Sequence, residues 1–529
     1  MNLDRRRFLR AAAGAGGLLI ARPELAGAQS PVESHFPTSR ASRLFPDSGR
    51  FVVHSDLHNH SLLSDGAAEA DGWFQAMRAA GLDVAALTDH AVLGKLHGDV
   101  TCNKLVDPTR PDTGTGLCSS YVGINETSWQ QLADMADAGN DPGAFVAMRG
   151  FEWTTGSRGH INVWFSEQWV DALLTGSITE VRDADTLFDA VLGQQLPPEI
   201  VQIIDTLPST ASIDGFWDWL AAPVGSLPLG GGADALAGLN HPNEFGNFED
   251  FRFFEQVAER VVSIEAFNGP AHVDQHLGDY WFYGVNDGMP WPINAALNAG
   301  WRTGLIGVSD NHTSTVGNPQ AARGGLWVTE LSRQGVRDAL ERRRMFASRL
   351  QGLRLDAAAH GVPMGNDVGH PGGPLLVDVD LDWGPDSWGE PVVIEVAGAG
   401  EDAPRQLDAV AVTVPAPTDP VISFSVDVDP DEVAWVLLRV CRAGQELDVN
   451  AVEGPWTAHG GAIAYSSPFW LVGSGTAGAI DNAGERSTPT TGGGSSALVA
   501  GGLAIAAAAL ASRRGHGHSH GARDDLSRG

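Results

Sequence analysis

One short stretch, DLHNHSLLSDG (residues 56–66), decides the fold, and it directly follows the apolar run 51–53. It places His58 and His60 two residues apart and Asp65 five residues further on, where a strand gives way to a loop. Side chains two apart on a strand point to the same face, so the histidines are placed to bind one cation while the loop returns Asp65 towards a second. Paired histidines also occur on surfaces or in hydrogen bonds, so this stretch alone leaves both interpretations open.

Apolar runs of strand length end in ligand-type residues at several other places. These are 83–87 with Asp89 and His90, 144–148 with Glu152, 236–239 with Asn240 and His241, 261–264 with Glu265, and 305–308 with Asp310 and His312, while His160 opens the run 161–165. Segments with a helical pattern, such as 72–80 and 248–261, lie between some of these strands, which favours βα units around a parallel barrel. Since the active site of such a barrel lies at the carboxyl ends of its strands, we expect these residues to converge on one site.

The motifs resemble those of the PHP superfamily, named for polymerase and histidinol phosphatase domains, over about residues 51–350. They appear in order as His58-Asn59-His60 with Ser64-Asp65-Gly66, Thr88-Asp89-His90, Glu152, His160, Asn240-His241-Pro242 and Asp310-Asn311-His312. The resemblance implies an α/β fold, a distorted (β/α)7 barrel with two or three divalent metals, and a hydrolase that usually cleaves phosphate esters. The sequences around two of these motifs, GFEWT (150–154) and GHIN (159–162), resemble those of an exported branch that includes carbaryl (carbamate ester) hydrolases.

The ligand types themselves limit the metal. Imidazoles and carboxylates without thiolates suit zinc, manganese or iron, whereas calcium prefers oxygen ligands. We expect one ion at His58, His60, Glu152 and Asp310, a second at Asp65, His90 and His312 with Glu152 bridging, and a third completed by His160 and His241. A metal-bound hydroxide would be the nucleophile.

Five polar residues have roles that the sequence leaves open. Asp310 or an outer histidine such as His312 is a candidate to carry the proton, and Asp89 is a candidate to orient an imidazole N–H. Arg158 is placed either to bind a phosphate oxygen or to lie on a surface loop. Glu265 either takes part in the site or caps the next segment.

Other aromatic and histidine residues have an ordinary interpretation beside a functional one. The segment 280–291 is predicted to wall the site or to pack in the core. Histidines without strand-end context are predicted to be surface or satisfied residues: His54, His97, His272, His276, His360 and His370.

The composition sets the outer bounds. With 529 residues and 43% hydrophobic content, the chain is long enough for two domains plus tails. A net charge of -31, with Lys95 and Lys104 as the two lysines, argues against nucleic acid, whose binding needs cationic side chains.

Both ends of the sequence resemble targeting segments. Residues 1–28, with Arg5-Arg6-Arg7 before a small apolar run and Ala26-Gly27-Ala28 as a cleavage site, resemble a twin-arginine signal peptide, so we expect export by the twin-arginine translocase, with 29–50 as a linker. A Gly/Ser/Thr-rich linker (474–496), an apolar run (497–512) and a basic, His-rich tail (513–529) predict a C-terminal membrane anchor and a periplasmic or cell-surface enzyme. A sorting tail that is removed after export has the same pattern.

The region between barrel and tail, 351–473, reads as a small C-terminal β-sandwich. Its strands are predicted at 374–381, 391–396, 421–428 and 433–440, and it carries no cluster of catalytic residue types. Cys102 and Cys118 could pair in an oxidising exterior, and Cys441 is predicted to be buried.

Two classes of function follow from these observations. The first is a metallohydrolase acting on a small-molecule ester, with phosphate esters ahead of carbamate or carboxylic esters. The second is an exported binding protein in which metals only stabilise a scaffold.

Overall fold

The computed structural model describes residues 39–91, 123–155, 158–170, 172, 175, 213–226, 229–269, 279–370, 372–443 and 461–473. The predicted signal peptide, Cys102, Cys118, the C-terminal linker, the anchor and the tail lie outside these residues, so those expectations stay predictions. Within the described ranges, no helix has both the length and the apolar character needed to cross a membrane.

Seven strands carry or adjoin the predicted ligands: β1 (Phe51–Asp56), β2 (Val84–Leu87), β4 (Val146–Thr154), β5 (His160–Trp164), β6 (Leu236–Asn240), β7 (Val261–Asn268) and β8 (Gly304–Val308). They are hydrogen-bonded in this order, and the short β3 (His90–Ala91) pairs with β4. The β4–β5 and β5–β6 pairings are antiparallel and the others are parallel. A parallel bridge between Asn59 and Asn311 joins the chain just past β1 to the chain just past β8, so the two ends of the series meet there.

These strands are buried on both faces. Along β1 and β2, alternate side chains belong to two different apolar clusters, with Val53 and Val84 in one and Val52 and Ala85 in the other. A strand that contributes to two cores reads as a continuous apolar run, which is why short apolar runs marked these strands in the sequence.

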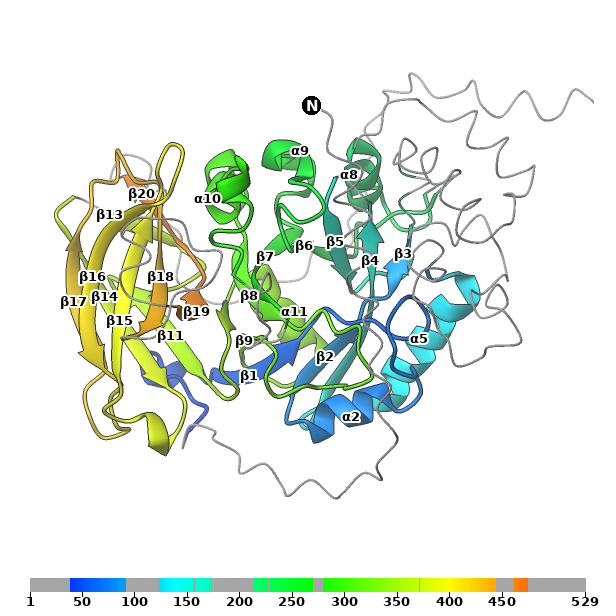
Figure 1. Cartoon of the computed structure of the whole chain (residues 1–529), viewed down its shortest axis with the longest axis horizontal. Coiled ribbons are helices and arrows are strands. Elements are labelled where there is room, and N and C mark those ends of the chain that lie inside the picture. The colour runs from blue at the N-terminus through cyan, green and yellow to red at the C-terminus, as the bar shows by residue number, and fades with distance from the viewer. Residues whose placement is uncertain are drawn as a thin grey trace, which may run out of the picture. The chain divides into compact units, whose positions relative to one another are not determined.

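Helices lie along the strands. They are α2 (Trp73–Ala79), α5 (Glu126–Gly139), α8 (Asp214–Ala221), α9 (Phe248–Phe251), α10 (Pro292–Ala299) and α11 (Arg333–Glu341), with short 3-10 turns η1 (Pro46–Ser48), η3 (Glu255–Val257), η4 (Val285–Asp287) and η5 (Pro385–Ser387). Figure 1 shows α8, α9 and α10 in a row along one side, with α2 and α5 on the opposite side. The mixed α/β class expected from the sequence is therefore confirmed.

The predicted helix over 248–261 is wrong, including its first turn. Residues of α9 have φ between 53° and 59°, which is the left-handed region, and such a turn cannot continue as a right-handed helix. Asn247 accepts a hydrogen bond from the backbone N–H of Asp250 and fixes this turn. The chain then passes through η3 and enters β7 at Val261.

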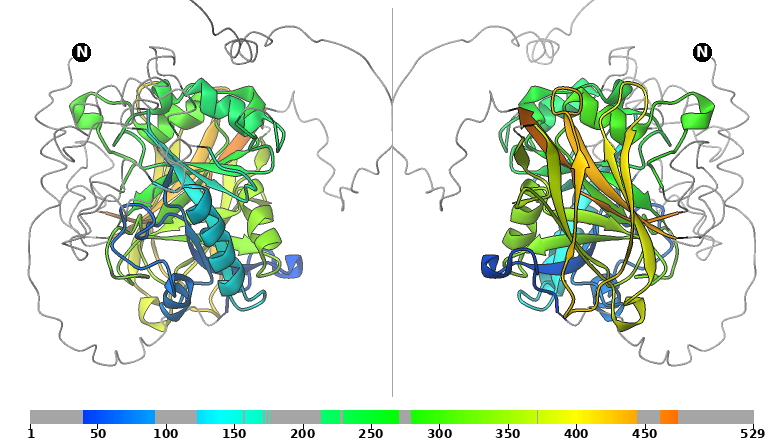
Figure 2. Two further views of the ribbon diagram at one scale, coloured as in Figure 1. Left: turned by 90° about the vertical axis from the view of Figure 1, so that its right-hand side faces the viewer. Right: turned by 90° about the vertical axis from the view of Figure 1, so that its left-hand side faces the viewer.

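The strands that follow extend the same sheet. β9 (Arg323–Val328) pairs with β1, β10 (Met345–Ser348) pairs with β9, and β10 pairs in turn with β19 (Ala462–Ser466). β19 pairs in turn with β18 (Trp435–Arg442), where the sheet branches. On one branch β18 pairs with β15 (Pro391–Gly398), which pairs with β16 (Arg405–Thr413). On the other branch β18 pairs with β20 (Phe469–Gly473), which pairs with β13 (Asp367–His370). β12 (Val362–Pro363), β11 (Arg354–Ala359), β14 (Pro374–Asp382) and β17 (Ile422–Asp427) form a separate sheet. The right view of Figure 2 shows these C-terminal strands, in yellow to orange, facing the viewer.

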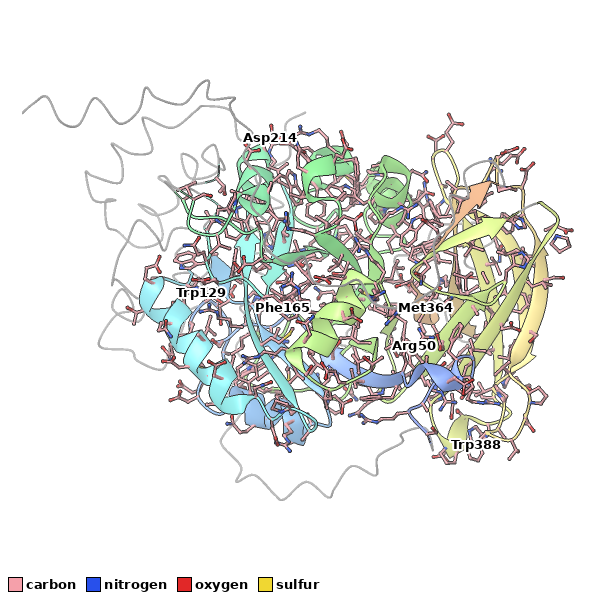
Figure 3. All side chains as sticks on the ribbon, turned by 180° about the vertical axis from the view of Figure 1, so that it is seen from behind. Arg50, Trp129, Phe165, Asp214, Met364 and Trp388 are labelled. Carbon is pink, nitrogen blue, oxygen red and sulfur yellow. The ribbon has the colours of Figure 1, made fainter. Side chains whose placement is uncertain are left out.

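The regions before and after residue 350 also share side-chain contacts. Asn298 Nδ2 in α10 donates to the carbonyl of Gly400, and Trp435 Nε1 donates to Asn298 Oδ1. Tyr465 Oη donates to Asp279, and Met364 is buried where side chains fill the space between the two regions (Figure 3). Cys441 is buried here, as predicted.

Residues 39–50, predicted as linker, are packed against both regions. Arg40 forms an ion pair with Asp83 at 2.7 Å, and Ser42 Oγ donates to Asp356 Oδ2 at 2.6 Å. The segment therefore fastens the start of β1 to the separate C-terminal sheet.

Candidate metal centre

Strand direction explains why the predicted ligands meet. His58, His60, Asp310 and His312 follow the ends of parallel neighbours, whereas His160 opens β5. Because β5 runs antiparallel to β4 and β6, its first residue lies at the same end of the sheet as their last residues; His160 pairs with Thr154 and Asn240.

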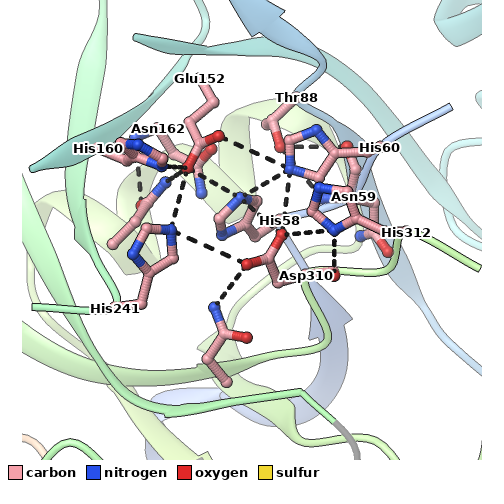
Figure 4. A network of polar contacts seen from close by, with 12 residues as sticks. His58, Asn59, His60, Thr88, Glu152, His160, Asn162, His241, Asp310 and His312 are labelled. Carbon is pink, nitrogen blue, oxygen red and sulfur yellow. Dashed lines mark hydrogen bonds and ion pairs between the residues drawn. The ribbon is translucent and has the colours of Figure 1, made fainter. Parts of the chain in front are cut away.

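The structure brings all nine predicted ligands together, and Figure 4 shows His58, His60, Glu152, His160, His241, Asp310 and His312 in one network. Their donor atoms form four overlapping groups in which every atom lies within 4.8 Å of the others: His60, Asp65, His90 and His312; His58, His60 and Glu152; His58, His241 and Asp310; and His90, Glu152 and His160. The grouping differs from the expected one, because His60 belongs to the group of Asp65 and His312 as well as to that of Glu152. His60 and Glu152 thus lie between the groups.

The donor atoms are spaced as ligands of one ion would be. His58 Nε2 lies 3.2 Å from Glu152 Oε1 and 3.2 Å from Asp310 Oδ1, and His60 Nε2 lies 3.1 Å from the same Asp310 oxygen. Two ligand atoms that each lie about 2.0–2.2 Å from a metal are roughly 3.0–3.5 Å apart. Three buried donor atoms, Asp65 Oδ1, Asp310 Oδ1 and His160 Nδ1, face other ligand atoms at 3.1–3.2 Å and have no well-aligned hydrogen bond within the described residues. The donor set and its spacing therefore fit divalent metal ions.

Glu265 is a buried carboxylate that holds His58. Its Oε1 lies 2.8 Å from His58 Nδ1, while its Oε2 accepts hydrogen bonds from the backbone N–H of His241 and from Asn268 Nδ2. The bond fixes the ring so that Nε2 faces Glu152 and Asp310. The sequence left open whether Glu265 takes part in the site or caps the next segment, and these contacts match a role within the site.

Other polar residues orient the remaining ligands. Asn240 Nδ2 donates to Glu152 Oε1 at 2.7 Å, and Asn268 Nδ2 donates to Asp310 Oδ2 at 3.1 Å. Thr154 Oγ1 lies 2.7 Å from His90 Nδ1. Partners of this kind fix ring orientation and ligand basicity in metal sites.

Within the described residues Asp89 makes no direct hydrogen bond to an imidazole, so it is not the direct orienter that was expected. Its oxygens accept from the Ser61 backbone N–H, from Ser61 Oγ and from Ser64 Oγ. Ser64 Oγ in turn lies 3.3 Å from His60 Nδ1. Because Asp89 sits at the base of the loop 61–66, its carboxylate fixes the loop and reaches His60 through a serine.

Arg158 is a partly exposed residue that lies near Glu249. Its NH1 is 3.8 Å from Glu249 Oε1, and its side chain is 34% exposed. The guanidinium thus has an acidic partner on α9. Its predicted role with a phosphate oxygen stays a prediction.

The burial of opposite charges sets the pKa values of the metal-free cluster. Burial lowers the pKa of His312 and of His241, but neighbouring carboxylates outweigh it and raise both to about 9. Burial and the nearby His312 and His90 lower the pKa of His60 to about 3. Burial would raise the pKa of Glu152, but His160 and His58 hold it well below its usual range. Imidazoles nearby likewise hold the pKa values of Asp65 and Asp310 well below their usual range against the effect of burial, so these three ligand carboxylates are ionised at neutral pH.

Solvent reaches one side of the cluster. The side chains of His58, His60 and Glu152 are fully buried, whereas that of His312 is 38% exposed and those of Asp65 and Asp310 are 17% exposed. Solvent therefore reaches the cluster at His312, Asp65 and Asp310.

Two ligands have unusual backbones. Asp310 has φ 46° and His241 has φ 22°, and Asp310 is held there by a hydrogen bond from its N–H to the carbonyl of His58. Such conformations are uncommon for these residue types and cluster at functional sites.

Two further residues lie beside the cluster: Tyr280, from the segment predicted to wall the site or to pack in the core, and Glu244, which was not predicted. Tyr280 Oη donates to Glu244 Oε2 at 2.5 Å, and Glu244 lies in the turn that follows His241. The position of Glu244 three residues after a predicted ligand was the available signal, but no strand end marks it.

Comparisons with known proteins found the following likenesses. The family model described as "Protein of unknown function (DUF3604)" matches residues 103–195. No curated protein matches the chain. Among solved structures, the chain is similar to a two-domain Bacteroides vulgatus protein containing a predicted PHP-like metal-dependent phosphoesterase, at 14% identity and a TM-score of 0.33 over 83% of this chain and 100% of that one. It is also similar to an amidohydrolase of Chromobacterium violaceum with bound sulfate and no metal, at 18% identity and a TM-score of 0.22 over 50% and 90% of the two chains.

Proposed function

We propose that the chain is a metal-dependent hydrolase of ester substrates, with phosphate esters as the first choice. The observation that carries the proposal is the convergence of six imidazoles and three carboxylates, all nine predicted from the sequence, on one end of the sheet. An ordinary core would not gather so many buried ionisable groups in one place, because each buried charge is costly unless it is paired.

Divalent ions bound at such a cluster lower the pKa of water and stabilise negative charge on an ester undergoing attack. The chain's own residues do the rest. Glu265 and Asn240 keep His58 and Glu152 oriented, so the donor atoms need little reorganisation. Asp310 is partly exposed and receives a hydrogen bond from Asn268, so it is placed to accept or return a proton at the solvent side.

We infer three finer features along with the activity. The seven strands β1 to β8 with β3 set aside would be the distorted (β/α)7 barrel of the PHP type, and the strands after residue 350 would form the sandwich that packs on it. Zinc or manganese, with iron as a further choice, would be the metal. Export by the twin-arginine route and retention at the membrane through 497–512 remain proposals from the sequence.

The test is a panel of initial rates with the manganese- or zinc-loaded protein. The substrates are p-nitrophenyl phosphate, bis-p-nitrophenyl phosphate and 1-naphthyl methylcarbamate. Chelator-sensitive hydrolysis of either phosphate ester supports the proposal. Hydrolysis of the carbamate alone favours the second candidate, a carbamate or carboxylic ester hydrolase, and no hydrolysis of any substrate would favour a metal-stabilised binding protein.

A further inference from the structure

Glu244 is an acidic residue beside the cluster that the metal assignment does not use. It lies in a tight turn after His241, where its N–H donates to the carbonyl of His241 at 3.1 Å. Asn243 fixes the turn, because its Nδ2 donates to the carbonyls of Tyr283 and Pro290. The place of Glu244 is therefore set by the same turn that carries a ligand.

Tyr280 fixes the direction of the Glu244 side chain. Its hydroxyl lies 2.5 Å from Glu244 Oε2, and the tyrosine is fully buried. Burial and the charge of Glu244 raise the Tyr280 pKa well above its usual value, so the tyrosine keeps its proton and the carboxylate accepts. Glu244 as a whole residue is half-buried; burial raises the pKa of its carboxyl group, and the neighbouring His241 opposes this shift.

The charge of Glu244 acts on the metal cluster. It interacts electrostatically with His241 and with Asp310. With Asp65, Glu152, Asp310 and the buried Glu265, it makes five carboxylates in or beside the cluster. Two divalent ions would bring four positive charges, and three would bring six, so the net charge presented to a substrate stays small.

The next residue, Phe245, is an exposed apolar side chain at the same place. Its ring stacks on that of His160, with centroids 4.6 Å apart and planes 2° apart, and 36% of the residue remains exposed. A phosphodiester carries one negative charge and a second organic group, whereas a monoester carries two charges and no such group. An acidic residue beside an exposed aromatic ring suits the diester.

We propose, on the basis of the function proposed above, that Glu244 and Phe245 select monoanionic phosphodiesters over dianionic monoesters. Glu244 repels the second negative charge of a monoester, and Phe245 contacts the second ester group of a diester. Tyr280 acts as a positioning residue for Glu244.

The experiment measures kcat/KM of the manganese-loaded full chain for bis-p-nitrophenyl phosphate and p-nitrophenyl phosphate at pH 8. We expect the wild type to prefer the diester. Glu244→Gln should raise the rate for the monoester about tenfold relative to that for the diester, since one removed charge acts twice on a dianion. Phe245→Ala should lower kcat/KM for the diester about tenfold relative to that for the monoester.

Matched controls are Glu255→Gln, which removes an exposed charge on η3, and Phe253→Ala, which removes a ring that is 38% exposed. Both should leave the ratio of the two rates unchanged. Metal content is measured for each variant, and a lost metal equivalent in Glu244→Gln would overturn the proposal by making Glu244 a ligand. A ratio unchanged by both site variants would also overturn it.

Failure of the hydrolase assignment gives a different result, namely no chelator-sensitive hydrolysis of either ester by the wild type. Calorimetry then measures the binding of inorganic phosphate and of diethyl phosphate to the metal-loaded chain, and it tests whether Glu244 disfavours the more highly charged anion. Glu244→Gln should tighten binding of phosphate more than that of diethyl phosphate, and equal changes would contradict the proposal.

Discussion

At the scale of single residues, the site depends on side chains that hold the ligands as well as on the ligands themselves. Glu265 uses both oxygens, one towards His58 Nδ1 and one towards the backbone N–H of His241. A single carboxylate therefore connects two strand ends that each deliver a ligand.

Glu265→Gln should weaken metal binding by about 10- to 100-fold without unfolding the protein. An amide has one acceptor oxygen, so its NH₂ must face either the His58 ring or the His241 N–H, both of which need an acceptor. Competition with a chelating dye measures the affinity, and Glu259→Gln, on a side chain that is 95% exposed, is the control. An unchanged metal affinity in Glu265→Gln would mean that Glu265 fills space in the core and does not orient the ligands.

Metal uptake at pH 7 should release protons. The pKa values of His241 and His312 are raised to about 9 in the metal-free protein, so both rings are protonated at pH 7, while a metal binds the neutral ring. The same raised pKa values stabilise the metal-free fold below pH 6.5, and this contribution is lost as the pH rises through about 9. Calorimetry in two buffers of different ionisation enthalpy measures the release. The absence of any proton release would show that these rings are neutral or are not ligands.

Much of the residue scale was predictable. Most of the nine ligand candidates stand at or just past a strand end, and strand ends are visible as the ends of apolar runs; Asp65 lies further on, in the loop after β1. The partners of Asp89 and the pairing of Glu244 with Tyr280 were not predictable, because they depend on the direction of side chains from segments far apart in the chain.

At the scale of elements, the loop after β1 decides whether Asp65 reaches the cluster. The loop folds back tightly, since the N–H of Gly66 donates to the carbonyl of Ser61. A Cβ at position 66 would lie 2.4 Å from the backbone carbon of His60.

Gly66→Ala should therefore displace the loop and remove the group of His60, Asp65, His90 and His312 as a metal site. We expect a loss of about one metal equivalent with little change in the circular dichroism spectrum. Gly369→Ala in β13 is the control, because a Cβ there meets nothing within 4 Å. Full metal content in Gly66→Ala would mean that the loop adapts or that Asp65 is not a ligand.

The elements show where sequence patterns succeed and fail. The apolar runs 83–87 and 305–308 predicted β2 and β8, and the helical pattern of residues 72–80 predicted α2. The segment 248–261 has the same period, yet its first turn is left-handed and an extended stretch follows, because tertiary packing of Phe248 and Phe251 overrides the local preference.

At the scale of the whole molecule, the large sheet continues across residue 350, where the sequence suggested a boundary between domains. β10 pairs with β9 on one side and with β19 on the other. Pairings between strands more than 100 residues apart leave no periodic signal, so the continuity could not be predicted from composition or turn residues.

A chain truncated after Leu350 should fail to fold. It would leave β10 without β19 and uncover the buried face under Trp435 and Tyr465. The matched control is truncation after Ala477, which keeps the compact unit 1–477. Size-exclusion chromatography and circular dichroism decide the matter, and a soluble, folded, metal-binding 39–350 fragment would contradict the expectation.

The most direct measurement is the metal content of the purified wild type and of His58→Ala, taken together with hydrolysis of the phosphate esters before and after chelation. The account predicts two or three divalent ions per wild-type chain, activity that disappears on chelation and returns with manganese or zinc, and loss of both metal and activity in His58→Ala. A wild type that binds no divalent ion, or a metal-free His58→Ala protein with full activity, would contradict it.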